Sequence, residues 1–273
     1  MEDEKIGYKS VIDFGRSAKV YFPHNIGDYP TKILPQVIKE FILRFSNEEE
    51  LILDPFCGSG TTAVECYFNK RFSINIDINP KAIEIAKEKL KAIENSFFVD
   101  KGLLKKQVLI ISDARDLPIK DESVDLILTD IPYADMIKYS NLENDLSNIE
   151  DYQTFLIEIS KAFGEMKRVL KRDKYAIIFC ADYRLGKSRL ILPIHSDVIN
   201  LMLDLGFVLF DLYIWRYYRS GSFRPFGSPP YQSMNTHTYI LVFQKRNINQ
   251  ITKNRPVRYR KRLIEKLNYL NNS

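Results

Sequence analysis

Residues 51–62 read LILDPFCGSGTT, and this stretch decides the fold of the chain. A short apolar run ends in Asp54, Gly58 and Gly60 follow, and residues able to open a helix begin at Thr61. Glycine lets a backbone turn sharply and approach a ligand closely. Free N–H groups at a helix start favour an anionic or carboxylate-bearing group. The stretch therefore predicts a strand, a tight turn that can bind a ligand, and a helix.

On both sides of this stretch, apolar runs alternate with amphipathic segments, which is typical of a parallel α/β fold. The expected strands are Leu51–Leu53, Phe72–Ile76, Gln107–Ile111, Val124–Thr129, Lys174–Cys180, Phe207–Trp215 and His237–Phe243. The expected helices are Ile33–Phe45, Thr61–Asn69, Pro80–Asn95, Asp151–Leu170 and His195–Leu205. A linker rich in Gly, Pro and Ser joins the last two strands, so they read as a long antiparallel hairpin.

Three acids follow three successive strands. Asp54, Asp77 and Asp113 each stand where an apolar run ends. Ligands of doubly wound sheets bind at the carboxyl ends of the strands, and an acid after the second strand is well placed to bond ribose hydroxyls. Each acid alone could equally be a helix cap or turn former. A nicotinamide site is disfavoured, because Gly60 is followed by Thr-Thr-Ala with no third glycine.

Composition bounds the class of protein. The 273 residues suit one large domain, and a hydrophobic share of 45% suffices for a full core. No apolar run approaches the ~18–20 residues of a membrane helix, and the polar, acidic start MEDEKIGYKS is no secretory signal. Three cysteines without a C-x-x-C pair argue against a disulfide framework or a zinc site. We expect a cytoplasmic protein with no membrane or metal partner.

The formal charge of +5 is concentrated at the carboxyl end. From Lys245 onward there are nine Lys or Arg residues against one acid, Glu265. We therefore divide the chain into a catalytic domain, residues 1–244, and a basic tail, residues 245–273, that is a candidate for contacting phosphates. The alternative for the tail is a solvated segment that only aids solubility.

The 51–62 stretch resembles motif I of the amino-group methyltransferases that methylate adenine N6 or cytosine N4 in DNA. Residues 126–133, LILTDIPY, resemble their catalytic motif (D/N/S)PPY, and residues 29–32, YPTK, resemble the H-x-Y-P-x-K segment that precedes motif I in part of the family. The resemblance implies a Rossmann-like class I methyltransferase with a seven-stranded, mostly parallel sheet that ends in an antiparallel hairpin. It implies S-adenosylmethionine as the cofactor.

The resemblance also assigns cofactor residues. Asp77 would take the ribose, Asp113 the adenine amino group, Asp54 with the two glycines the methionine part, and Lys32 the cofactor carboxylate. The full expected set is Tyr29, Thr31, Lys32, Asp54, Phe56, Gly58, Gly60, Thr61, Asp77, Ile78 and Asp113.

The expected catalytic residues are Asp130, Ile131, Pro132 and Tyr133. The amino group of a base is a poor nucleophile, because its lone pair is delocalised into the ring. The Asp130 side chain and the Ile131 carbonyl could accept hydrogen bonds from its two N–H groups, and the Tyr133 ring could stack on the base. The family usually has proline where Ile131 stands, so this turn is expected to be less rigid. Residues 228–231, SPPY, also match the catalytic motif, but they follow no apolar strand and are set aside.

A base inside a duplex must leave the stack to reach such a site. The loop at 216–236 interleaves arginines with aromatic residues, which suits phosphate contacts and base stacking. The expected nucleic-acid contacts are Arg216, Tyr217, Tyr218, Arg219, Phe223 and Arg224.

Three functions remain open at this point. The leading one is a site-specific DNA methyltransferase of the restriction-modification kind, with room for a restriction endonuclease partner and no choice made between adenine and cytosine. The second is an RNA enzyme that methylates a guanine amino group in tRNA. The third is a nucleic-acid binder that has lost catalysis, which only Ile131 supports. The three histidines, His24, His195 and His237, are expected to be structural or surface residues.

Overall fold

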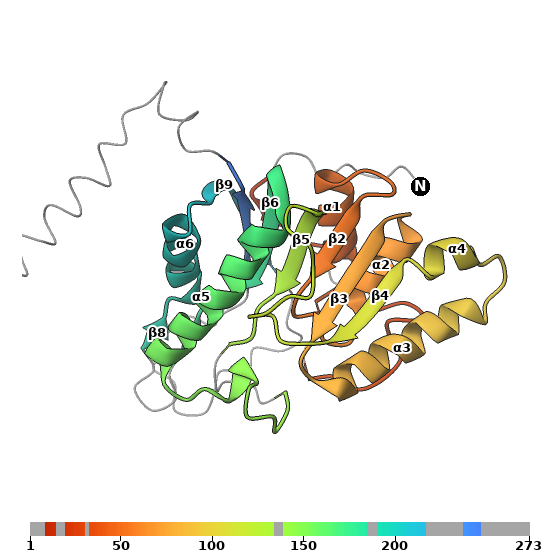
Figure 1. Ribbon diagram of the computed structural model, residues 1–273, viewed down its shortest axis with the longest axis horizontal. Helices are drawn as coiled ribbons and strands as arrows, with labels where there is room; N and C mark the ends of the chain where they lie inside the picture. Colours follow the sequence, from red (N-terminus) through yellow and green to blue (C-terminus); the bar gives the residue numbers. More distant parts are fainter. Residues whose placement is uncertain are drawn as a thin grey trace, which may run out of the picture.

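The computed structural model describes residues 9–14, 20–30, 33–133, 139–184, 190–216 and 237–246. Its centre is an eight-stranded sheet in the order β1-β9-β10-β6-β5-β2-β3-β4. Figure 1 shows β6, β5, β2, β3 and β4 of this sheet in that order. The strands of this sheet are β1 Val11–Ile12, β2 Leu51–Asp54, β3 Phe72–Asp77, β4 Gln107–Ile111, β5 Val124–Asp130, β6 Leu170–Cys180, β9 Val208–Arg216 and β10 His237–Gln244. All neighbouring pairs are parallel except those that β10 makes with β6 and β9.

The expected fold class is confirmed, and the number of strands is corrected from seven to eight. The added strand, β1, is two residues long and pairs parallel to β9. A separate two-stranded hairpin joins β7 Tyr183–Arg184 to β8 Ile191–Leu192. Strands this short have no alternating pattern of their own, so only their tertiary partners reveal them.

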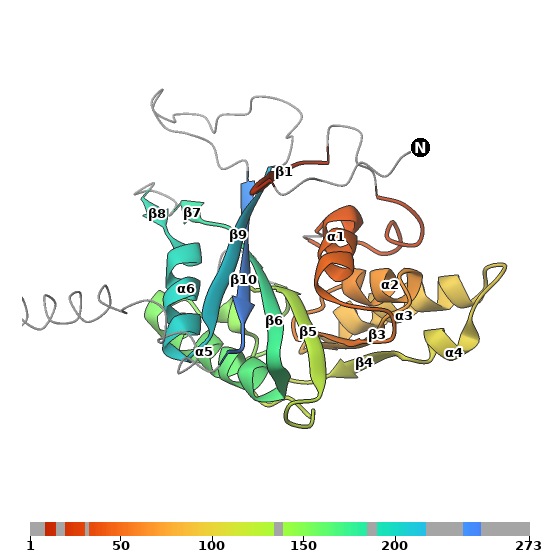
Figure 2. The same ribbon diagram turned by 90° about the horizontal axis from the view of Figure 1, so that it is seen from above.

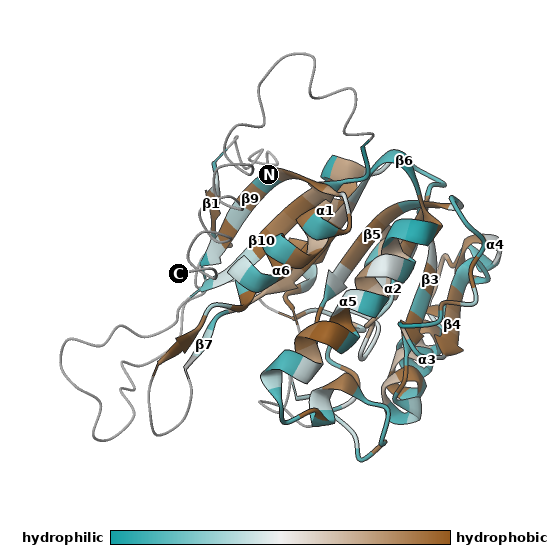
Figure 3. Cartoon of the chain, turned by 60° about the vertical axis from the view of Figure 1, so that its left-hand side comes forward, coloured by the Kyte–Doolittle hydropathy of each residue, from teal (hydrophilic) through white to brown (hydrophobic). Residues whose placement is uncertain are grey.

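Helices cover both faces of the sheet (Figure 2). Their bounds are α1 Pro35–Phe45, α2 Thr61–Phe68, α3 Pro80–Glu94, α4 Lys101–Leu104, α5 Tyr152–Val169 and α6 Ile194–Asp204. Helix α1 packs Phe41 and Ile42 against Leu128 and Phe179 on one face. Helices α5 and α6 pack on the opposite face, and Figure 3 shows the apolar strands between helices whose outer sides are polar.

The helix ends follow local chemistry. Helix α1 begins at Pro35, two residues later than expected, because proline suits the first helical turn and has no N–H to leave unpaired. Asn79 caps α3 by accepting a hydrogen bond from the Lys81 N–H, and Asp151 caps α5 through the Thr154 N–H. Within the described ranges, no helix is both long enough and apolar enough to cross a membrane.

Candidate active site

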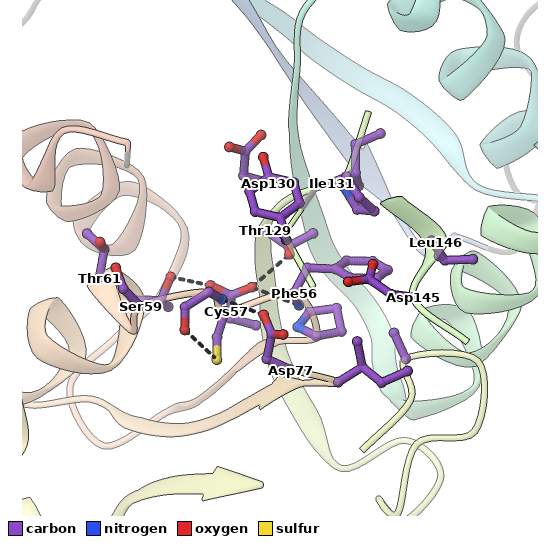
Figure 4. A pocket seen from close by; sticks show the side chains of 18 of the residues that line it. Phe56, Cys57, Ser59, Thr61, Asp77, Thr129, Asp130, Ile131, Asp145 and Leu146 are labelled. Atoms are coloured by element: carbon purple, nitrogen blue, oxygen red, sulfur yellow. Dashed lines mark hydrogen bonds between the residues drawn. The ribbon is translucent and has the colours of Figure 1, made fainter. Parts of the chain in front are cut away.

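One pocket, whose empty volume of about 910 Å³ includes some open solvent, lies at the carboxyl ends of β2, β3 and β5. It brings together the two motifs that the sequence set apart, the glycine turn of residues 55–59 and the turn of residues 130–132. Figure 4 shows Asp130 and Ile131 on one side of this pocket, with Cys57 and Asp77 on another. Of the residues expected to hold the cofactor, the described ones that line it are Tyr29, Asp54, Phe56, Gly58, Thr61, Asp77, Ile78 and Asp113.

The glycine turn takes its shape from contacts with neighbouring segments. Gly58 has φ 48°, and a Cβ there would come within 2.9 Å of the Tyr29 ring. Gly60 has φ 78°, and a Cβ there would come within 2.6 Å of the Ala86 Cβ on α3. Both glycines therefore permit a left-handed backbone and close packing at once. Gly60 serves helix packing and is not among the pocket-lining residues.

Asp54 ties three elements together under the pocket. Its carboxylate accepts hydrogen bonds from the Thr62 hydroxyl at 2.6 Å, the Thr129 hydroxyl at 2.7 Å and the Phe56 N–H at 3.2 Å. Burial raises the pKa of Asp54 to about 6 despite these donors. Asp54 thus joins β2, α2 and β5, and its contribution to the pocket is mainly to fix their positions.

Asp77 and Asp113 differ in how much of each carboxylate is engaged. Asp77 accepts one backbone hydrogen bond on each oxygen, from Gly58 and from Asn79, both at 2.8 Å. Burial raises its pKa to about 6. Asp113 is clasped by the Arg115 guanidinium, with the shortest contact at 2.6 Å. Burial would raise the pKa of Asp113, but the hydrogen bonds from Arg115 lower it overall. Asp77 therefore keeps more lone-pair capacity for a ligand than Asp113 does.

The 130–133 turn begins at the end of β5. Burial raises the pKa of Asp130 to about 7, and the Tyr133 hydroxyl, which donates to Asp130 Oδ1 at 2.7 Å, offsets part of the rise. Tyr133 is partly buried and packs against the core, and it is not among the residues lining the pocket. In this arrangement its hydroxyl occupies one acceptor position of Asp130.

Ile131 is held by packing where the family motif has proline. Its side chain is 1% exposed and lies in the core cluster with Leu146 and Ile178. Its N–H donates to the Phe179 carbonyl at 3.4 Å. Close packing of this side chain therefore restrains the turn, although it does not fix φ as a proline ring would.

Residues 139–148 form part of the pocket wall, which the sequence did not predict. Tyr139, Asn144, Asp145 and Leu146 line the pocket, and the Tyr139 ring stacks on Tyr29 at 5.7 Å. Asn79 donates to the Tyr139 carbonyl at 2.9 Å, and Arg115 donates to the Asn144 carbonyl at 2.8 Å. Asn79 follows β3 and Arg115 follows β4, so these hydrogen bonds attach the wall to the carboxyl ends of the strands.

A buried lysine supports the glycine turn from α3. Lys89 is 0% exposed, and its Nζ donates to the carbonyl oxygen and hydroxyl of Ser59 at 2.7 and 3.0 Å. The sequence offered one signal for it, since Lys89 falls on the same face of α3 as Ala82, Ala86 and Ile93. A charged residue inside an apolar stripe indicates a buried polar partner.

The segment of residues 20–30, here called the strap, carries Tyr29 to the pocket. Its anchor is Glu65 of α2, which is fully buried and accepts hydrogen bonds from the Tyr21 hydroxyl and from His24 Nε2. Gly27 packs so closely on Ile85 of α3 that a Cβ would come within 2.5 Å of it. His24, expected to be structural or on the surface, is therefore a buried structural residue.

Several expected residues cannot be placed. Thr31 and Lys32 lie outside the described residues, as do Tyr217, Tyr218, Arg219, Phe223 and Arg224. Arg216 is described at the end of β9, is half exposed and pairs with Asp13 at 2.6 Å. Within the described ranges, no group of three or more His, Cys, Asp or Glu residues could hold a metal ion. Cys57, Cys66 and Cys180 are buried free thiols.

Comparison with known proteins agrees with this architecture. A methyltransferase of Methanosarcina mazei, described as S-adenosylmethionine-dependent, superposes with a TM-score of 0.50 at 16% identity, over 75% of this chain and 96% of that one. That likeness shows the fold, a Rossmann-like methyltransferase sheet. A model of methyltransferase domains also matches residues 53–131.

A second family model identifies a family that is more specific than the methyltransferase fold. The model of the N6/N4 methyltransferases, described as DNA methylase, matches residues 10–88 and 124–271, most of the chain. The chain therefore belongs to the DNA methylase family.

Two relatives are similar to parts of this chain. The Type II methyltransferase M.MjaII of Methanocaldococcus jannaschii is 37% identical over 94 residues, covering 33% of this chain and 18% of that protein. The Type II methyltransferase M.HpaI of Haemophilus parainfluenzae is 42% identical over 77 residues, covering 28% of this chain and 24% of that protein. The aligned part of this chain spans less than a quarter of each relative's length.

Proposed function

We propose that this chain transfers a methyl group from S-adenosylmethionine to an exocyclic amino group of a base in DNA. One observation carries the proposal: the glycine turn and the 130–132 turn line a single pocket. A cofactor on the first and a base on the second would meet without any domain movement. Family membership supports the substrate class.

The charge of the pocket supports the cofactor. Five carboxylates line it, those of Asp54, Asp77, Asp113, Asp130 and Asp145, and no lysine or arginine of the described residues does. An acidic, partly desolvated hollow favours a cation, and S-adenosylmethionine carries a sulfonium that its demethylated product lacks. Asp77 is the candidate for the ribose hydroxyls, with Ile78 beside it for the adenine face. Lys32 remains the candidate for the cofactor carboxylate.

The catalytic role falls to the 130–133 turn. When bound, the cofactor supplies an electrophilic methyl group. Asp130 and the Ile131 carbonyl would accept hydrogen bonds from the two N–H groups of the target amino group and so direct its lone pair at that methyl. With a pKa of about 7, Asp130 can also accept the proton that the nitrogen loses near neutral pH. Tyr133 would turn its ring to the base once its hydroxyl leaves Asp130.

Nucleic-acid contacts are proposed for the 216–236 loop and for the basic tail of residues 245–273. Arg216 stands at the same edge of the sheet as Asp130, because β9 and β5 point in the same direction. The other loop residues, including Arg219 and Arg224, are proposed as nucleic-acid contacts on the evidence of their sequence alone. A restriction endonuclease partner and a cytoplasmic location also remain proposals.

The experiment is incubation of the purified chain with methyl-labelled S-adenosylmethionine and either DNA or RNA, followed by nucleoside mass spectrometry. We expect N6-methyladenine or N4-methylcytosine from DNA, and the product decides between the two bases. Methylguanosine from RNA would replace this proposal with the tRNA alternative. Cofactor binding without product on either nucleic acid would favour a binder that has lost catalysis.

A further inference from the structure

A second group of side chains stands at the catalytic edge of the sheet and begins one strand away from Asp130. It consists of Asp182, His195 and Tyr239, here called the His195 platform. Asp130 is in register with Phe179 of β6, and Asp182 follows three residues later on the same chain. Tyr239 of β10 is in register with Cys180. Since neighbouring strands lie about 4.8 Å apart, the platform begins beside the catalytic turn.

The histidine ring is fixed on two sides. His195 Nδ1 contacts both oxygens of Asp182, at 2.7 and 2.8 Å, and the His195 N–H donates to Asp182 at 3.1 Å. One ring face stacks on Tyr239, with centroids 4.1 Å apart and planes 17° from parallel. A ring held by a carboxylate and a stacking partner has lost its rotamer freedom before any ligand arrives.

The platform remains partly open to solvent. The His195 side chain is 26% exposed, whereas His24 and Phe41, two rings that pack inside the fold, are 2% and 0% exposed. Continuing along the edge, His237 contacts Tyr239 edge to face at 4.9 Å and is in register with the exposed Arg216. Outward from the catalytic turn, this edge therefore presents first a partly exposed imidazole ring and then a guanidinium.

We propose that the His195 platform stacks a nucleobase that neighbours the target base. The inference rests on the proposed function and adds a binding surface to it. A rigid, partly exposed ring near the pocket offers base stacking, and Arg216 at the far end offers a phosphate contact. The platform would hold the strand in place while the target base occupies the pocket, and it touches no reacting atom.

The first test compares binding of a fluorescein-labelled DNA single strand to His195→Ala, His195→Phe and wild type by anisotropy. Stacking of one base is worth about 1–3 kcal/mol by alanine substitution, so His195→Ala should weaken binding about tenfold. His195→Phe keeps a ring face and should stay within about threefold of wild type. The matched control is Phe98→Ala, which removes a fully exposed ring after α3, at the opposite edge of the sheet. S-adenosylmethionine affinity, measured by calorimetry, should not change in any of the three.

Wild-type affinity of a folded His195→Ala variant, or an equal loss in the alanine and phenylalanine variants, overturns the platform. Because His195 also joins β6 to the start of α6, the alanine variant could lose stability. Photo-crosslinking of the wild-type chain to DNA containing 5-iodouracil then decides. A crosslinked peptide containing His195 or Tyr239 supports the platform, and crosslinks confined to other segments overturn it.

The same anisotropy measurement with an RNA strand of equal sequence distinguishes DNA from RNA as the nucleic acid that the platform binds. A loss on His195→Ala that appears with RNA and not with DNA overturns DNA as the partner. The wild-type methylation assay distinguishes the two proposals: a wild type that methylates DNA, paired with an unaffected His195→Ala, removes the platform and keeps the enzyme.

Discussion

The Tyr133 hydroxyl donates a hydrogen bond of 2.7 Å to Oδ1 of Asp130. The residue that should stack on the target base therefore occupies one acceptor of the residue that should grip its amino group. A base that enters the pocket must displace this hydroxyl. The hydrogen bond also keeps the pKa of Asp130 lower than burial alone would set it.

Tyr133→Phe should accordingly shift the pH dependence of methylation. Turnover needs Asp130 as a carboxylate, so the rate should fall as pH drops through about 7. Without the hydroxyl the pKa of Asp130 rises, and the acid limb should move up by about half to one pH unit, while the retained ring preserves stacking. Rates from pH 5.5 to 9.5 at saturating cofactor and subsaturating DNA measure this, because they report the pKa of Asp130 before a base displaces the hydroxyl. An acid limb at the same pH in both proteins would contradict the coupling.

Asp130→Ala should abolish most turnover and leave the cofactor bound. Losing one group that stabilises developing charge costs about 100-fold or more in rate. The affinity for S-adenosylmethionine should remain within about twofold, because Asp77 and the glycine turn are unchanged. Calorimetry with single-turnover methylation separates the two effects. Asp77→Ala is the reciprocal variant and should weaken cofactor binding first; normal methylation by Asp130→Ala would remove its catalytic role.

The ligand-free chain should become less stable as pH rises from about 4 to about 7. The pKa values of Asp54, Asp77 and Asp130 are raised to about 6, 6 and 7. In the unfolded chain such groups titrate near 4, so the folded chain binds more protons between these limits. This contribution to stability is complete below pH 4 and lost above pH 7. Urea unfolding at pH 5, 6, 7 and 8 measures it, and a flat or rising free energy of unfolding would contradict it.

Lys89→Met should loosen the glycine turn. The change leaves the buried Ser59 carbonyl and hydroxyl without their Nζ donor, which costs about 1–3 kcal/mol of stability. Cofactor affinity should fall with it, because Ser59 belongs to the pocket wall. Lys87→Met, at an exposed position of the same helix, is the matched control. Equal melting temperatures and affinities for the two variants would show that Lys89 does not support the turn.

Asp13→Asn should strengthen nucleic-acid binding. Asp13 pairs with Arg216 at 2.6 Å and therefore competes with phosphate for the same guanidinium. Exposed ion pairs are worth about 0–1 kcal/mol, so the gain should be at most about fivefold and should shrink as salt rises. Glu84→Gln, an exposed acid on α3, controls for net charge. An equal gain in both variants would point to net charge alone.

The sequence predicted the long elements well because their signals are local. Strands such as β5 are continuous apolar runs, and their acids fall at one sheet edge because parallel strands all end there. Tyr139 and Asp145 could not be foreseen as pocket residues, since their place depends on hydrogen bonds from Asn79 and Arg115 across the fold. For the same reason β1 escaped notice, because two residues become a strand only beside β9.

The strap makes the chain before the glycine turn part of the catalytic unit. Tyr29 reaches Gly58 from a segment that is fixed by the hydrogen bonds of Glu65 to Tyr21 and His24 and by the close packing of Gly27 on α3. A domain excised from Leu51 onward would keep the acids and the turn and leave that turn bare on one side. Any transplant of the pocket into another protein must therefore carry the strap along, even though the glycine turn itself begins only at residue 55.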